Sequence, residues 1–533
     1  MEKALKMGQT SAVGSFWLFL GKMLSTIILA VGIIVLGWFI SEPDYGLYAI
    51  ALIPATTFLL FQDCGISSAM TKYCARYRAA GRAYELRTII AAGLTFEIVS
   101  GLVLTVISVV TANFIASTMF GNPDSALLIS FASITILFTS IFVGAQAVFV
   151  GFERMRLISL ALICQSVTQG VLSPLLVYLG YGAWGAIVGY TLASVITGII
   201  SLVLLYSAVF RKLPKSESIS INLFQTLRPL LKYGVPLAIA FISSGILTQI
   251  FLFIMGSVVD LAIIGNYRIA ANFAVLLTFF TVPITTNLFP TFSKLDPRNE
   301  QGLLKTVFTS SAKYTAFFLV PATMALMVLS QQIISTLYGS KWPYAPLFLS
   351  LYVITYLFSL FGNLSVNSFL TAIGETKTLM KLNMLNLSVG IPLAFLLIPN
   401  FGIIGLISCM IISGMPSVLI GLYWASKHYA VKVDFKASAK ILLASISAAL
   451  TTYLFLAAFN AAAWIMLTAG VIVFLAFFLI VAPLIGAINQ TDINNLRSMF
   501  SGLGVISTLL EIPLRLMEKP LKIRFQRDET GYH

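Results

Sequence analysis

Four charged residues interrupt long apolar stretches of this 533-residue chain, and they are the side chains best suited to hold an ion or a charged ligand. Lys22 and Glu97 lie about 16 Å inside their apolar runs at 1.5 Å per residue, whereas Arg268 and Asp63 lie nearer to the ends of theirs. A charge at that depth is costly in hydrocarbon unless it faces a bundle interior or water. Two such cations with few acids favour an anionic ligand, such as a phosphate or pyrophosphate group.

Each of these four residues has more than one interpretation. Lys22 faces an internal cavity, reaches towards the membrane surface or pairs with Glu97, and Arg268 faces the cavity or reaches the outer headgroups. Glu97 is a packed neutral acid, a partner for Lys22 or a proton-coupling carboxyl. We expect Asp63 to cap a helix end or to pair with the basic loop that begins at Lys72.

Uncharged polar residues also fall within apolar stretches. Gln249 and Asn272 are candidates to line a polar cavity, although hydrogen bonds between helices explain most such residues without a ligand. The four Cys and two His residues lack metal-ligand spacing, and no phosphate-binding GxxxxGK[ST] loop is present in the sequence. We therefore predict no catalytic residue, no metal and no cofactor.

The composition excludes a soluble protein. Hydrophobic residues make up 59% of the chain, charged residues only 10%, and the mean hydropathy is +0.96. A soluble domain is about a quarter charged. The net charge of +14 would suit nucleic acid in a soluble chain, but in a membrane protein it indicates basic cytoplasmic loops, so we expect no nucleic-acid partner.

Apolar windows long enough to cross a bilayer core about 30 Å thick recur along the whole chain. They cover 12–38, 46–66, 88–115, 125–150, 157–179, 184–209, 233–257, 262–288, 312–337, 345–371, 379–398, 402–425, 439–459 and 463–486. All of the 33 Lys and Arg residues except Lys22, Arg268 and Lys341 then lie on one side of the membrane. This asymmetry predicts a multi-pass cell-membrane protein with both termini in the cytoplasm.

An internal repeat relates two sets of six spans. Three turns recur at an offset of 218 to 220 residues: Gly46–Ala51 with Gly265–Ala270, Phe120–Gly121 with Tyr338–Gly339, and Gly182–Gly185 with Gly402–Gly405. An even number of spans gives both halves the same orientation, and parallel repeats of this kind are typical of transporters with a central site.

The repeat predicts an all-α membrane protein of about 14 transmembrane helices in four parts. Residues 1–212 would form an N-lobe of six spans and residues 213–430 a C-lobe of six spans, around a central cavity. Two extra spans follow in 431–487. The tail, 488–533, mixes apolar and basic residues, so we expect amphipathic helices along the anionic inner leaflet.

A series of short motifs runs through the first twelve spans: Ser15–Lys22, Glu42–Tyr48, Asp63–Ala69, Gly265–Ala270, Phe289–Lys294, Tyr338–Gly339, Ala345–Leu349, Gly374–Lys377 and Leu397–Gly405. Together they resemble the polysaccharide-transporter family of the multidrug/oligosaccharidyl-lipid/polysaccharide (MOP) flippase superfamily. The sequence departs from the family pattern at Trp38, where many members carry Arg, and at Gln249, near which many carry an acid.

The resemblance implies a non-enzymatic flippase for surface polysaccharide or glycoconjugate synthesis. It would carry a polyprenyl-phosphate- or pyrophosphate-linked oligosaccharide across the membrane by alternating access, through a cavity lined by spans one, two, seven and eight. Lys22 and Arg268 would then hold the phosphates. The implied partners are the lipid-linked glycan, membrane lipids and the glycan polymerase or glycosyltransferase machinery.

Two other functions stay open at this point. A cation-coupled multidrug or metabolite exporter would use the same scaffold. An integral-membrane glycosyltransferase or glycan polymerase is the other alternative, but such enzymes usually need a sizeable soluble loop or domain, and the predicted loops are short.

Overall fold

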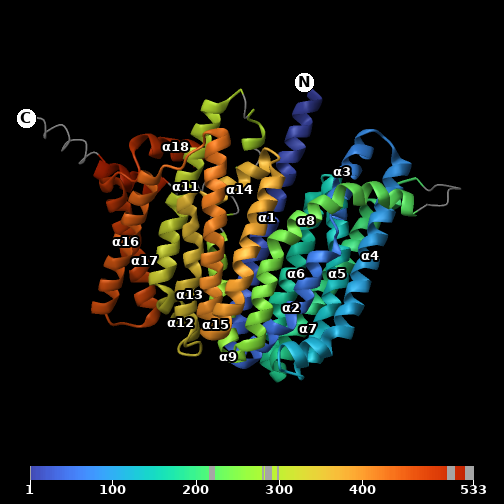
Figure 1. Cartoon of the computed structure of the whole chain (residues 1–533), viewed down its shortest axis with the longest axis horizontal. Coiled ribbons are helices and arrows are strands. Elements are labelled where there is room, and N and C mark those ends of the chain that lie inside the picture. The colour runs from blue at the N-terminus through green and yellow to red at the C-terminus, as the bar shows by residue number, and fades with distance from the viewer. Residues whose placement is uncertain are drawn as a thin grey trace, which may run out of the picture. The chain divides into compact units, whose positions relative to one another are not determined.

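The computed structural model of the chain consists almost wholly of helices (Figure 1). It describes residues 2–214, 223–278, 281, 288, 291–296, 299–500 and 511–521. The chain divides into two compact units, one of Met1–Arg268 with Ala394–Leu406 and one of Ile269–Leu393 with Ile407–His533. The domain limits at residues 212, 430 and 487 stay predictions.

The first unit is a bundle of long apolar helices joined by short turns. Capping residues help to define the turns: at the start of α2 the Ser41 hydroxyl accepts a hydrogen bond from the Asp44 amide, and Pro43 occupies the first turn. The elements are α1 (Glu2–Phe39), α2 (Glu42–Gln62), α3 (Ile66–Ala79), α4 (Ala83–Phe114), η1 (Ile115–Met119), α5 (Ser125–Gly151), α6 (Met155–Leu176), η2 (Val177–Tyr181), α7 (Gly182–Ala208), η3 (Phe210–Lys212), α8 (Leu223–Val258) and the first part of α9 (Leu261–Ala274).

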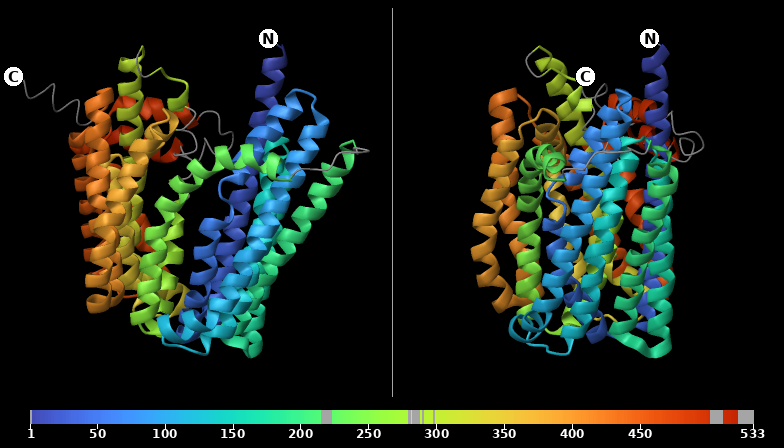
Figure 2. Two further views of the ribbon diagram at one scale, coloured as in Figure 1. Left: turned by 45° about the vertical axis from the view of Figure 1, so that its right-hand side comes forward. Right: turned by 90° about the vertical axis from the view of Figure 1, so that its right-hand side faces the viewer.

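Within the first unit, the helices contact each other mainly through small and apolar residues. Helix α6 lies between α1 and α7, and α5 lies between α4 and α7. The Ser25 hydroxyl of α1 donates to the Leu162 carbonyl of α6 at 3.2 Å, which fastens these two helices. Helix α8 is curved along its length (Figure 2), and it contains Pro229 and Pro236, which remove backbone hydrogen bonds.

The second unit holds the remaining helices. They are the end of α9, η4 (Val275–Leu277), α11 (Gln301–Val328), α12 (Ser330–Tyr338), α13 (Ala345–Tyr352), η5 (Val353–Phe361), α14 (Asn363–Ala372), most of α15 (Thr376–Tyr429), α16 (Phe435–Ala458), α17 (Ala463–Ile485), α18 (Gln490–Phe500) and a helix at 511–521. Leu514, Met517 and Leu521 of the last helix share a buried cluster with Phe478 and Ile493. These three side chains of the helix at 511–521 therefore pack on protein, within this unit.

The prediction of an all-α membrane protein is confirmed. Ten helices in the described residues are long and apolar enough to cross a membrane, and a pair bent by 58°, Ala345–Phe361 with Asn363–Ala372, would be an eleventh. Two of the ten each hold two predicted spans, with interruptions at Gly180 and at Gly402. The count of fourteen stays a prediction, and the span predicted at 262–288 lies partly outside the described residues.

One predicted span has the wrong limits. The ninth window was placed at 312–337, but α11 covers Gln301–Val328 and the separate helix α12 follows it. Lys305 and Lys313 lie in the first half of α11, and a hydropathy window shifts away from cations even where the helix continues through them.

Candidate functional site

The first turns of α2 and α9 lie against each other in the first unit. A Cβ atom on Gly46 would lie 1.9 Å from a backbone oxygen of α9, and one on Gly265 would lie 2.2 Å from the carbonyl oxygen of Glu42. Glycine is therefore required at both positions. The Asn266 side-chain amide also donates a hydrogen bond to the Glu42 carboxylate. The crossing fixes the position of Arg268, which follows on α9.

Arg268 lies close enough to two tyrosines to interact with them electrostatically. They are Tyr48 of α2 and Tyr190 of α7. The Tyr48 ring is stacked on Tyr45 with centroids 5.8 Å apart, and it meets the Tyr190 ring edge-on at 6.4 Å. Within the part of the chain that the structure describes, the Arg268 Nε is buried and has no hydrogen-bond partner. A guanidinium with an unused donor beside phenols is suited to bind phosphate oxygens or sugar hydroxyls.

Lys22 lies on α1 with an exposed side chain. Its carbonyl accepts a hydrogen bond from the Thr26 hydroxyl at 2.8 Å, and its ammonium forms no ion pair with any described acid. Gly21 and Ser25 form the side of α1 that touches α6. At about 100° per residue, Lys22 points to one side of that contact. The charge is therefore available to a ligand.

Glu97 of α4 is completely buried, with 0% of the residue exposed. A Cβ atom on Gly144 of α5 would lie 3.1 Å from its Cγ, so α5 covers it closely. Among the described residues neither of its carboxyl oxygens makes a hydrogen bond of ordinary length and angle. The ionisable groups that act on it are the Asp63 carboxyl, which lies within hydrogen-bonding reach, and Cys64. The ion pair with Lys22 that the sequence allowed is not formed in this structure.

Asp63 fixes the turn between α2 and α3. Its carboxylate accepts hydrogen bonds from the Ser67 amide at 2.7 Å and from the Ser67 hydroxyl at 2.9 Å, the pattern of a helix cap. Lys72 instead lies over the Tyr233 ring of α8, 3.9 Å from its centroid.

The two polar residues predicted to line a cavity lie in different units. Gln249 of α8 accepts hydrogen bonds through its Oε1 from Thr57 at 3.0 Å and from Thr56 at 3.4 Å, which ties α8 to α2. Asn272 is half-buried on the part of α9 that belongs to the second unit.

Sequence reasoning missed the tyrosines around Arg268. Tyr48 carried one signal, because it lies in the repeated Gly-x-Tyr turn that also contains Tyr267. Tyr190 carried none, since it lies outside the motifs, and only the packing of α7 on α2 brings it to this site.

A family model described as "Polysaccharide biosynthesis protein" matches residues 11–296, which is more than half of the chain. The chain belongs to this family. Its long apolar helices agree with a multi-pass membrane protein of this polysaccharide biosynthesis family, the class that the sequence motifs resembled.

Curated relatives extend this similarity. An uncharacterized membrane protein of Methanocaldococcus jannaschii is 23% identical over 69% of this chain and 74% of its own length. The probable low-salt glycan biosynthesis flippase Agl15 of Haloferax volcanii is 20% identical over 58% and 70%. The lipopolysaccharide biosynthesis protein WzxC of Escherichia coli is 25% identical over 60% and 62%. The relatives named for an activity are flippases or biosynthesis proteins of this class, in agreement with a non-enzymatic polysaccharide biosynthesis protein.

Solved structures show the same fold. The lipid II flippase MurJ in an inward closed conformation superposes with a TM-score of 0.68 at 17% identity, over 86% of this chain and 97% of that one. An inward-facing multidrug resistance MATE family transporter of the MOP superfamily gives 0.62 at 17% identity, over 76% and 94%.

Proposed function

We propose that this membrane protein is a flippase for a polyprenyl-phosphate- or pyrophosphate-linked glycan, which it moves from the inner to the outer leaflet of the cell membrane by alternating access. The observation that carries the proposal is the environment of Arg268, whose buried Nε has no partner in the described chain and lies near Tyr48 and Tyr190. Two relatives support this substrate class: one is named a probable low-salt glycan biosynthesis flippase and the other a lipopolysaccharide biosynthesis protein.

In this proposal Lys22 and Arg268 both bind the phosphate, but in different ways. Arg268 offers a planar set of N–H donors that suits two phosphate oxygens at once, and the tyrosines near it offer apolar faces and hydroxyls for the first sugar. Lys22 is a mobile point charge on another helix, which follows the phosphate during transit. Both lie where hydrocarbon surrounds the bundle, so their attraction for a phosphate is stronger than in water.

Glu97 and Asp63 are the proposed coupling groups. A fully buried carboxyl costs much more when ionised than when neutral. Gain or loss of its proton therefore alters the packing of α4 on α5 and the field on Asp63, which caps the next helix. In this scheme a proton gradient drives the conformational cycle, and both chain termini are cytoplasmic.

A cation-coupled exporter on the same scaffold is the second candidate, and the MATE-like fold favours it. An exporter of cationic drugs needs acids in its binding site. The two residues that we assign to ligand binding, Lys22 and Arg268, are cations, and the acid Glu97 is fully buried under α5, so the flippase is the better-supported function.

The test is transbilayer movement of a polyprenyl-pyrophosphate-linked oligosaccharide in proteoliposomes that contain the purified full chain. A glycan-cleaving enzyme added outside reports headgroups that have crossed. We expect flipping by the wild type, strong loss in Lys22→Ala and in Arg268→Ala, and no loss in Arg211→Ala, whose exposed side chain lies on η3. Extrusion of a cationic dye without any flipping would replace the flippase with the exporter.

A further inference from the structure

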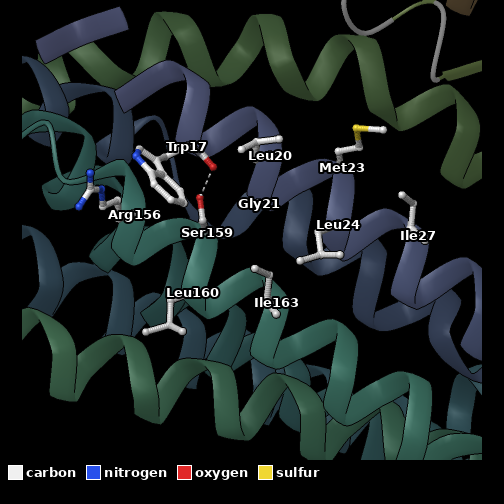
Figure 3. A pocket seen from close by; sticks show the side chains of 10 residues that line it. All are labelled: Trp17, Leu20, Gly21, Met23, Leu24, Ile27, Arg156, Ser159, Leu160 and Ile163. Carbon is white, nitrogen blue, oxygen red and sulfur yellow. Dashed lines mark hydrogen bonds between the residues drawn. The ribbon is translucent and has the colours of Figure 1, made fainter. Parts of the chain in front are cut away.

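A groove between α1 and α6 of the first unit has no role in the proposed transport step. It has a volume of about 510 Å³ and is lined by Trp17, Leu20, Leu24 and Ile27 of α1 and by Leu160 and Ile163 of α6. Figure 3 shows these side chains along the two helices, with Arg156 and Trp17 at one end and Ile27 at the other.

The walls of the groove are apolar and the floor is closed by tight packing. Leu24 is 48% exposed and Leu160 46% exposed, so large hydrophobic side chains border an open surface. A Cβ atom on Gly21 would lie 2.3 Å from the Ser159 side chain, which leaves no gap between the helices beneath them. The Ser159 hydroxyl donates to the Trp17 carbonyl at 2.8 Å (Figure 3). Its proton is therefore not available to a ligand in the groove.

The polar end of the groove is a single cation. The Arg156 guanidinium lies over the Trp17 ring, 4.7 Å from its centroid, and it forms no ion pair with a described acid. Its neighbour Arg154 is different, because its guanidinium donates to the Ala208 carbonyl at 2.8 Å. Stacking on Trp17 holds the plane of Arg156 and leaves its N–H edge for a phosphate.

The dimensions match one leaflet of a membrane. From Trp17 to Ile27 the axis of α1 rises by about 15 Å at 1.5 Å per residue. That distance is half of a hydrocarbon core of about 30 Å. A site with one cation at the headgroup end and an apolar channel one leaflet deep has the charge and shape of a phospholipid.

We propose that this groove binds an anionic phospholipid, with its phosphate on Arg156 and one acyl chain along α1 and α6. The occupant is a lipid of the surrounding bilayer and not the transported molecule, because Lys22 lies on the other flank of α1. Bound lipid would brace α1, the helix that carries Lys22, against α6. The proposal is independent of the transport function, since it concerns binding alone.

Native mass spectrometry of the full chain in detergent tests this binding. Phosphatidylglycerol and phosphatidylcholine with identical acyl chains are titrated separately, and retained lipid is counted for each. We expect the dissociation constant for phosphatidylglycerol to be about fivefold lower, the effect of one basic side chain on an anionic lipid. Arg156→Gln should abolish this difference, Arg156→Lys should keep part of it, and Arg211→Gln, an exposed arginine outside the groove, should keep all of it.

A second variant separates the apolar part of the site from its charge. Leu24→Trp fills the channel at an exposed position and should weaken both lipids to the same degree, with an unchanged melting temperature. Equal binding of the two lipids by the wild type, or an intact preference in Arg156→Gln, would overturn the proposal. Displacement of phosphatidylglycerol by an equimolar amount of polyprenyl phosphate would assign the groove to the carrier lipid instead.

Discussion

Gly46 and Gly265 occupy equivalent places in the predicted repeat, and in the structure each one lies at the point where α2 and α9 touch. The two helix starts that contain these glycines are thus predicted copies of one motif. They also contact each other. The same contact positions Arg268, so the shape of the proposed phosphate site depends on two residues that have no side chain.

Gly265→Ala should destabilise the protein by roughly 1 to 3 kcal/mol, the cost of forcing extra atoms into a packed site. The added Cβ would lie 2.2 Å from the Glu42 carbonyl oxygen. The measurement is the melting temperature by fluorescence-detected size exclusion. Gly302→Ala is the matched control, because Gly302 lies in a helix with no atom within 4 Å of its would-be Cβ, and it should be neutral or slightly stabilising. Equal melting temperatures of the two variants would show that α2 and α9 are not tightly packed at Gly265.

Arg268→Lys should reduce glycolipid flipping by about tenfold, since a charge-assisted hydrogen bond to a phosphate is lost while the charge is kept. Arg268→Gln should reduce it further. The readout is headgroup accessibility in proteoliposomes, with equal protein per vesicle. If Arg268→Lys were as active as the wild type, a point charge would be sufficient and the guanidinium geometry would be irrelevant.

Glu97→Gln should keep the fold and remove the response of flipping to a proton gradient. The amide has the shape of the neutral acid but cannot gain or lose a proton, and its NH2 group can still donate to the nearby Asp63 carboxylate. Flipping rates are compared with and without an imposed pH difference. Glu85→Gln on the same helix is the control, because Glu85 is paired with Arg82 at 2.6 Å near the helix start. A gradient response that persists in Glu97→Gln would remove Glu97 from the coupling mechanism.

The tail should detach on acidification. Arg497 donates hydrogen bonds to Glu511, and this contact lowers the pKa of the Glu511 carboxyl below its ordinary value. A group with a lowered pKa stabilises the folded state above its unfolded pKa, and the effect is lost as the pH falls through the folded value. The protection of the amides in 511–521, measured as the exchange rate relative to the intrinsic rate at each pH, should therefore fall below about pH 4.

Substitution gives the same comparison at neutral pH. Glu511→Gln should show at pH 7 the low protection factors that the wild type shows only in acid, and high salt should weaken the wild-type contact in the same direction. Slow exchange in Glu511→Gln at pH 7 would mean that the apolar contacts of Leu514 and Met517 hold the helix without the ion pair.

Periodicity and charge in the sequence predicted the features that repeat along the chain. Long apolar runs are dictated by the solvent that surrounds them, so the membrane class and most helix positions followed directly. Several of the family motifs, such as Glu42–Tyr48, Asp63–Ala69 and Tyr338–Gly339, also lie at helix ends and turns, where local geometry restricts the choice of residue.

Contacts between distant helices could not be predicted in this way. The depth of Lys22 and Glu97 in the membrane suggested a pair, but depth says nothing about the direction in which a side chain points. The packing of α4 on α5 turned Glu97 towards Asp63 and Cys64 instead. In the same way, Tyr190 reaches Arg268 only because α7 packs on α2.

The link from Thr56 and Thr57 to Gln249 joins two helices through groups that do not ionise at any physiological pH. An acid in place of Gln249 would add a second titrating position and make the fastening of α8 to α2 depend on acidity. With glutamine at this position, the contact between α8 and α2 is the same at the pH values found on either side of the membrane. A single change from amide to carboxylate at residue 249 would therefore be enough to make the contact between α8 and α2 depend on pH.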